Sequence, residues 1–161
     1  MLILMIIQTA IFTVTLIILI VQVREQVKAT RLEVYSKCQA DYSSLVRMLT
    51  RQGELRTIYD DLARVQPKEM GKWTTYSDRE KALYNYFELN YELFERVFIL
   101  WKKHWIDTET WKQWDAWMSE LCKHPIFGEV VRDNACMFDS AFERYVNDKL
   151  QKTKSTAYNT A

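Results

Sequence analysis

Glycine and proline are scarce in this sequence. Its 161 residues include three glycines and two prolines, a combined share far below the roughly 12% usual in globular proteins. Turn-rich β-sandwiches and barrels need many more of these residues. A glycine-rich phosphate-binding loop is excluded as well, because no two glycines lie close enough together to form one. The composition therefore favours an all-α fold.

Histidine and cysteine are also scarce. His104 and His124 are the two histidines, too few for a histidine-rich metal centre, and we expect no cofactor. Cys38, Cys122 and Cys136 are odd in number and show no CxxC or metal-like spacing. We interpret them as reduced cytosolic thiols that mostly fill the core. A cysteine left on the surface would be the reactive one.

Charge is absent from the first 23 residues, and Arg24 is the first charged residue. A helix of this length spans about 34 Å, enough for a hydrocarbon core of about 30 Å. The run lacks the basic start and the small-residue cleavage site of a secretory signal peptide. We therefore predict a transmembrane helix over 1–23. A buried core helix is the alternative, but so long an uncharged run exceeds what a small domain usually buries.

Five polar residues interrupt this apolar run. Thr9, Thr13 and Thr15 can hydrogen-bond to their own helix and are tolerated in lipid. Gln22 lies at the end of the run. Gln8 is costlier to bury, and two interpretations stay open: it faces a partner helix, or it lies hydrated near the outer interface.

Basic residues follow the apolar run, at Arg24, Lys28, Arg31 and Lys37. The positive-inside rule then predicts an inner (plasma) membrane protein with its N-terminus outside and its C-terminal part in the cytoplasm. Arg24, Lys28 and Arg31 are candidate contacts to anionic lipid. Nearby glutamates dilute this charge, so a strong polybasic switch is not expected.

The rest of the chain reads as one helical cytoplasmic domain over 24–151 and a flexible tail over 152–161. The apolar spacing after residue 27 continues the first helix as far as Gln52, and Gly53 is a natural stop. Further helices are expected over 54–65, 78–105, 108–122, 126–133 and 137–150, with a loop over 66–76. The fold class is thus all-α, with one transmembrane helix continuing into a small helical bundle.

Local signals support these boundaries. Ser77 and Glu80 have the spacing of a capping box, Asp107 is a candidate N-cap, and Pro125 suits the first position of a helix. The helix over 78–105 carries apolar residues on so much of its surface that we expect it at the centre of the bundle. Its expected core stripe is Leu83, Phe87, Phe94, Phe98, Trp101 and Trp105, and the next helix adds Trp111, Trp114, Met118 and Leu121.

Glu88, Glu92 and Glu95 share one face of that central helix. A di-metal carboxylate site would also need Glu-x-x-His pairs, which neither histidine provides. We interpret the three residues as a solvated acidic stripe, with a docking face for a basic partner as the alternative. Glu120 and His124 are four residues apart, a spacing that suits a structural pair at a helix end.

Tryptophan is unusually frequent, with six residues. Their helical spacing favours core positions, and we expect Trp73 and Trp117 to be the most exposed and candidates for partner contact. Nucleic-acid binding is not expected, because the formal net charge is only +1.

The stretch from Asn85 to Asp148 combines an aromatic-acidic helix, an Ile-Asp turn, Trp-x-x-Trp, a His-Pro break and a closing Phe-x-x-Phe/Tyr helix. This pattern resembles bacterial single-pass membrane proteins with a short helical cytoplasmic domain. The shared features are caps and core aromatics, so the resemblance implies a fold and no activity.

No catalytic constellation is visible. We therefore expect a membrane-anchored interaction protein, acting as an oligomeric scaffold or an accessory subunit of a membrane complex. Its expected partners are the bilayer and either further copies of itself or a larger membrane protein. The alternative is a membrane-tethered ligand sensor in bacterial stress or phage defence, which would need a concave polar pocket containing Arg or Lys.

Overall fold

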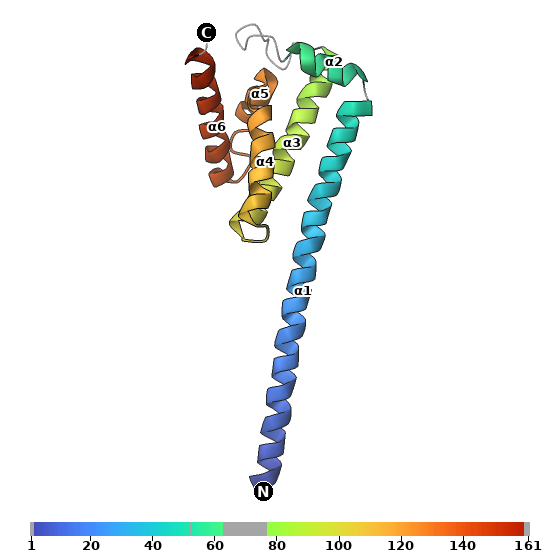
Figure 1. Cartoon of the computed structure of the whole chain (residues 1–161), viewed down its shortest axis with the longest axis vertical. Coiled ribbons are helices and arrows are strands. Elements are labelled where there is room, and N and C mark those ends of the chain that lie inside the picture. Colours follow the sequence, from blue (N-terminus) through green and yellow to red (C-terminus); the bar gives the residue numbers. More distant parts are fainter. Residues whose placement is uncertain (1, 52, 63–76, 160–161) are drawn as a thin grey trace. The chain divides into compact units, whose positions relative to one another are not determined.

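The computed structural model describes residues 2–51, 53–62 and 77–159, and in these ranges it contains six helices and no strand (Figure 1). The helices are α1 (Leu2–Arg51), α2 (Gly53–Leu62), α3 (Asp78–Lys102), α4 (Thr108–Leu121), α5 (Pro125–Asp133) and α6 (Ser140–Asn159). The predicted all-α class is confirmed. The chain forms two compact units, residues 1–37 and 38–161, which are described separately below. The predicted loop over 66–76 lies outside the described residues.

The first unit is the amino-terminal part of α1. Its large apolar side chains from Leu2 to Val23 are 46–75% exposed, and no residue of the most apolar window is buried against the described chain. By length and composition this helix can cross a membrane. The threonines bond back to their own helix as expected, with Thr9 Oγ1 2.8 Å from the Met5 carbonyl and Thr13 Oγ1 2.9 Å from that of Thr9.

The second unit is a bundle built around α3, which contacts α2, α4, α5 and α6 (Figure 1). Because buried residues recur around most of its circumference, α3 needs cover from several sides. Phe87 packs on Phe127 of α5, with ring centroids 5.9 Å apart, and Tyr91 packs on Phe142 of α6 at 5.1 Å. The predicted central position of this helix is therefore confirmed.

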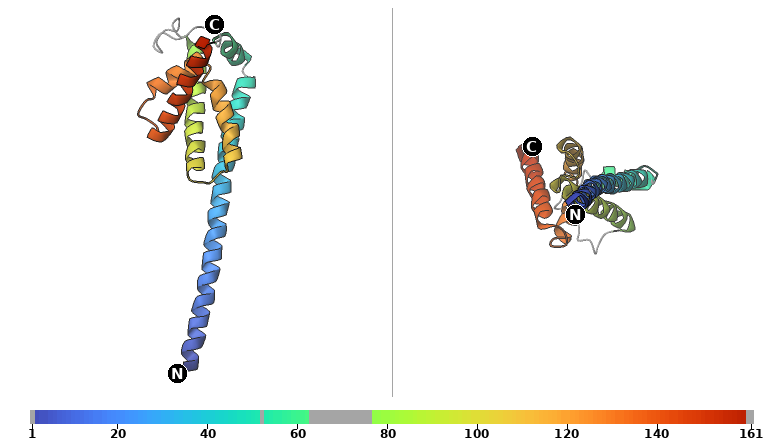
Figure 2. Two further views of the ribbon diagram at one scale, coloured as in Figure 1. Left: turned by 60° about the vertical axis from the view of Figure 1, so that its left-hand side comes forward. Right: turned by 90° about the horizontal axis from the view of Figure 1, so that it is seen from below.

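Helices α3 and α4 run antiparallel and are joined by a short turn (Figures 1 and 2). We predicted that α3 would reach Trp105, but it ends at Lys102. His104 adopts the left-handed conformation, with φ of 57°, and the Trp105 amide donates to the Leu100 carbonyl at 2.8 Å. This closure normally uses glycine or asparagine, so no residue type marked it in the sequence. Asp107 then caps α4, as predicted, by accepting from the Thr110 amide at 2.7 Å.

The boundaries of the last two helices are partly as predicted. Pro125 occupies the first turn of α5. Helix α6 begins at Ser140, not near residue 137, because the Asp139 carboxylate accepts from the amides of Ala141 and Phe142 at 3.0 and 3.1 Å. It continues to Asn159, beyond the predicted end at residue 150. No glycine or proline follows Gly128 in the sequence, so no breaker stops this helix.

Candidate functional site

Three of the four basic residues that follow the apolar run lie on one side of α1. Arg24, Lys28 and Arg31 are all exposed, and their spacing of four and three residues keeps them on a common helical face. This arrangement suits contact with anionic headgroups at a membrane surface. Glu25 and Glu33 are exposed on the same helix.

The acidic residues of α3 do not behave as one stripe. Glu92 is exposed, whereas Glu88 and Glu95 are half-buried. Glu95 Oε1 accepts a hydrogen bond from the Asp139 amide at 2.5 Å. Glu95 thus ties α3 to the start of α6, which corrects the interpretation of a uniformly solvated stripe. Only part of the predicted docking face is open to a partner.

Trp117 is half-buried and belongs to an aromatic cluster. Its ring centroid lies 4.6 Å from that of Tyr42 and 4.8 Å from that of Phe94, while Trp114 lies 5.5 Å from Tyr42. These edge contacts hold the last turns of α1 against α4 within the second unit. We predicted Trp117 to be among the most exposed tryptophans, and it is half-buried, as are Trp101 and Trp105, whereas Trp111 and Trp114 are buried. Trp73, the other candidate, lies outside the described residues.

A cavity of about 140 Å³ adjoins this cluster. Its wall combines aromatic side chains with two exposed glutamines, namely Gln39, Tyr42, Gln113, Trp114 and Trp117. Such a wall offers ring faces and neutral hydrogen-bonding groups, and it includes neither arginine nor lysine.

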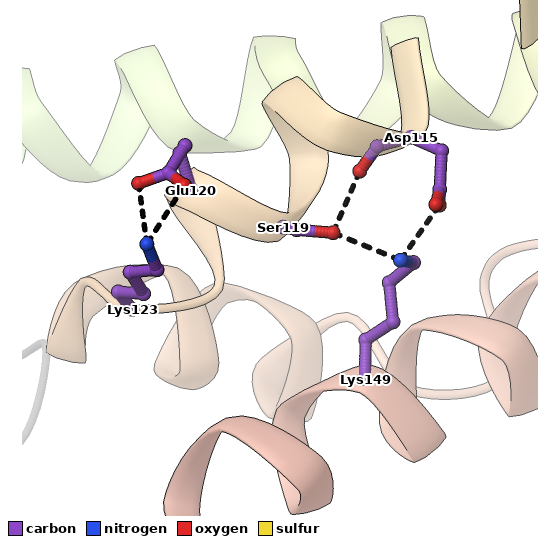
Figure 3. Close-up of polar contacts among 5 residues, drawn as sticks. All are labelled: Asp115, Ser119, Glu120, Lys123 and Lys149. Atoms are coloured by element: carbon purple, nitrogen blue, oxygen red, sulfur yellow. Dashed lines mark hydrogen bonds and ion pairs between the residues drawn. The ribbon is translucent and has the colours of Figure 1, made fainter. Parts of the chain in front are cut away.

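A polar cluster joins α4 to α6 (Figure 3). Lys149 Nζ lies 2.7 Å from Asp115 Oδ1 and 2.9 Å from Ser119 Oγ. The Tyr145 hydroxyl also donates to the Asp115 carboxylate, and the pKa of Tyr145 is raised, first by burial and then by this hydrogen bond and the carboxylate charge. We did not predict this cluster from the sequence, because its members lie 30 residues apart and only the packing of α6 on α4 brings them together.

The Ser119–Lys149 contact resembles a nucleophile beside a base, but its hydrogen bonds assign it another role. Lys149 is ion-paired with Asp115, and the Ser119 hydroxyl donates to the Asp115 backbone carbonyl at 2.7 Å. A nucleophilic hydroxyl must instead donate its proton to a base. The cluster therefore clamps α4 to α6.

His124 is buried, with 3% of its surface exposed, and it is the N-cap of α5. Its Nδ1 accepts from the Ile126 amide at 3.3 Å, and its Nε2 lies 3.2 Å from the Tyr59 carbonyl, so the neutral tautomer with the proton on Nε2 satisfies both contacts. Burial lowers the pKa of His124 to about 4, while the bond to Tyr59 opposes that shift. The predicted pairing with Glu120 is wrong, since Glu120 pairs with Lys123 at 2.7 Å.

The three cysteines differ in accessibility. Cys38 and Cys122 are buried and Cys136 is exposed. Burial raises the pKa of Cys122 to about 12, which keeps it a thiol at neutral pH. Cys136 is the one of the three that a water-soluble reagent can reach.

Comparisons of the chain with protein-family models, with curated proteins and with solved structures find no match.

The first prediction concerns acid stability. The pKa of His124 is about 4 in the folded protein against 6.5 ordinarily, so the unfolded chain binds the extra proton first as the pH falls. The contribution of His124 is complete above pH 6.5 and is lost between pH 6.5 and 4, by about 3 kcal/mol in all. Urea unfolding followed by tryptophan fluorescence measures this loss, because the five tryptophans that the structure describes lie in the second unit.

The matched control is His124→Asn, which keeps a capping acceptor and removes the titrating group. Wild type should lose more stability than this variant between pH 6.5 and 4. Parallel pH profiles for the two proteins would contradict the assignment of a neutral, buried His124.

The second prediction compares the two ion pairs in Figure 3. Lys149→Met leaves the half-buried Asp115 without its cation, and we expect a loss of about 1–3 kcal/mol in unfolding free energy. Lys123→Met removes the partner of Glu120 in an exposed ion pair, in which the Lys123 side chain is 60% exposed and that of Glu120 is 64% exposed. This change should lower the unfolding free energy by less than about 1 kcal/mol. Equal losses in urea unfolding would refute the clamp role of Lys149.

Proposed function

We propose that this chain is a membrane-anchored helical interaction protein, acting as an oligomeric scaffold or an accessory subunit of a membrane complex. In this proposal α1 spans the inner (plasma) membrane, with the N-terminus outside and the second unit in the cytoplasm. The observation that carries the proposal is the exposed, uncharged helical run from Leu2 to Val23.

Energetics support the anchor. Each large apolar side chain of this run gains about 1.5–3 kcal/mol on full removal from water. The run contains so many of them that the total exceeds the 5–15 kcal/mol of net stability typical of a whole domain. A bilayer is the environment that covers a helix on all sides. The basic residues Arg24, Lys28, Arg31 and Lys37 support the orientation through the positive-inside rule.

The second unit supports interaction over catalysis. Three of its reactive side chains have structural roles: Ser119 donates to a backbone carbonyl, both ring nitrogens of His124 have backbone partners, and Cys122 is a buried thiol. The surface beside Gln113 includes the aromatic ring of Trp117, a residue type enriched at protein interfaces.

The ligand-sensor alternative stays a prediction. It requires a concave polar pocket with a cationic side chain, and the cavity beside Trp117 has none in its wall. A neutral ligand is the class that this wall fits, and a thermal-shift screen of uncharged ligands addresses it.

The third prediction tests topology with a native cysteine. A membrane-impermeant maleimide should leave Cys136 unlabelled in intact cells and label it after permeabilisation, because the second unit lies in the cytoplasm. Cys136→Ser should abolish the signal, since Cys38 and Cys122 are buried. Labelling in intact cells would reverse the orientation, and recovery of the protein in the soluble fraction would refute the anchor.

The fourth prediction tests association through the second unit. Amine-reactive crosslinking in native membranes should give a discrete product larger than the monomer. Gln113→Arg places a charge beside Trp117 and should reduce that product severalfold, because a desolvated, unpaired charge is costly at an interface. Asn147→Arg, at an exposed position of α6, is the matched control and should leave it unchanged. A strictly monomeric protein would refute the interaction role.

A further inference from the structure

The two glutamines of the apolar run differ from its threonines. Thr9, Thr13 and Thr15 satisfy their hydroxyls within α1. Gln8 and Gln22 make no side-chain hydrogen bond within the part of the chain that the structure describes. In water such an amide is solvated, but in hydrocarbon it loses its hydrogen bonds to water, which is unfavourable unless another group replaces them. A spanning α1 therefore needs partners for these amides from outside the chain.

The position of these amides on the helix is regular. Gln8, Thr15 and Gln22 follow one another at intervals of seven residues. Seven residues make nearly two full turns of an ideal helix, so these three side chains lie on one face. A left-handed supercoil keeps that face directed at the partner helix along its whole length. The same heptad position continues through Ala29 and Ser36, which are small and exposed. We call these five residues the heptad face.

Shallow grooves lie on both sides of the amino-terminal half of α1, one of about 350 Å³ along Gln8 and Thr15 and one of about 610 Å³ along Thr9 and Thr13. The wall of the first groove contains two members of the heptad face and four large apolar neighbours: Leu4, Ile7, Gln8, Ile11, Phe12 and Thr15. Large apolar side chains around a polar stripe form the knobs and holes that helices use to pack in a coiled coil. Both sides of α1 therefore offer space for a second helix, and the amides of Gln8 and Gln22 distinguish the heptad face, since Thr9 and Thr13 are satisfied within α1.

We infer that α1 associates with α1 of a second copy, parallel and in register, through the heptad face. The inference rests on the proposed function, because the amides need partners only when the helix lies in a membrane. Copies inserted by the same signals share one orientation, so their spans are necessarily parallel. In-register pairing then brings Gln8 opposite Gln8 and Gln22 opposite Gln22.

An amide is the group that such pairing favours, because its oxygen accepts and its nitrogen donates, so two identical amides satisfy each other. A twofold axis places the same residue of each copy face to face. Gln8 and Gln22 are about 21 Å apart along the helix, and a shift by one residue would break both pairs. The two amides thus fix the register as well as the partner.

The fifth prediction uses the full-length protein in phosphatidylcholine vesicles, with association measured by energy transfer between labelled copies. The double variant Gln8→Leu/Gln22→Leu should lower the association constant about tenfold, because it removes the interhelical hydrogen bonds of both amide pairs. Thr13→Val is the matched control. Its hydroxyl already bonds to the Thr9 carbonyl, and it lies on the opposite side of α1 from Thr15, so association should not change.

A crosslinking arm tests the geometry in a Cys136→Ser background. Ala29→Cys lies on the heptad face, and Val27→Cys lies about 160° around the helix from it. Mild oxidation in membranes should give a disulfide-linked dimer at least fivefold more efficiently for Ala29→Cys. Equal efficiency at both positions would overturn the assignment of the face.

Two further outcomes would overturn the inference and leave the anchor standing. One is wild-type association of the double leucine variant. The other is a crosslink from Ala29→Cys to a different protein in place of a second copy. Alkaline carbonate extraction of the same membranes separates these outcomes from a failure of the proposed function, since a released protein would not be a spanning one.

Discussion

The second unit depends on the burial of α3 around most of its circumference. Leu83, Phe87, Tyr91 and Phe94 are fully buried along it, and the rings that cover them come from α4, α5 and α6. No single neighbouring helix could hide so wide an apolar surface. The other helices therefore take positions dictated by α3. This burial leaves two polar atoms, Asn90 Oδ1 and the Tyr91 hydroxyl oxygen, without a hydrogen-bond partner in the described structure.

Such unsatisfied groups cost about 1–3 kcal/mol each. Tyr91 offsets this through ring contacts with Phe138, Phe142 and Phe127, with centroids 4.5, 5.1 and 6.0 Å away. The other end of the Asn90 amide is satisfied, because Nδ2 donates to the Tyr86 carbonyl at 2.6 Å. Packing around α3 thus outweighs polar satisfaction at its centre. The remaining polar side chains serve at helix ends and between helices, as His124, Glu95 and Lys149 do.

The parts of this fold that the sequence predicts are those that local spacing controls. Ser77 with Glu80, Asp107 and Pro125 mark helix starts through contacts with residues at most four positions away, and all of these starts were found. The end of α3 was misplaced, because a histidine adopts a conformation that usually belongs to glycine. The start of α6 was also misplaced, because the cap at Asp139 competes with an apolar stretch that looks equally helical.

The candidate site was less predictable, because its contacts join distant segments. Tyr42 contacts Trp117 from 75 positions away in the sequence, and Glu95 accepts from the amide of Asp139 across 44 positions. A helical pattern gives the face of each residue, but not which face of another helix will meet it. Lys149 and Asp115 illustrate this limit, since both read as ordinary surface charges and only the packing of α6 on α4 joins them.

The polar residues of α1 differ in their hydrogen bonding. Threonine and glutamine look equally polar in a sequence, yet the threonines of the apolar run are satisfied by their own helix and Gln8 and Gln22 are not. In the membrane helix proposed above, insertion would depend on the apolar side chains and specific association on the amides, so one helix could carry both functions without conflict.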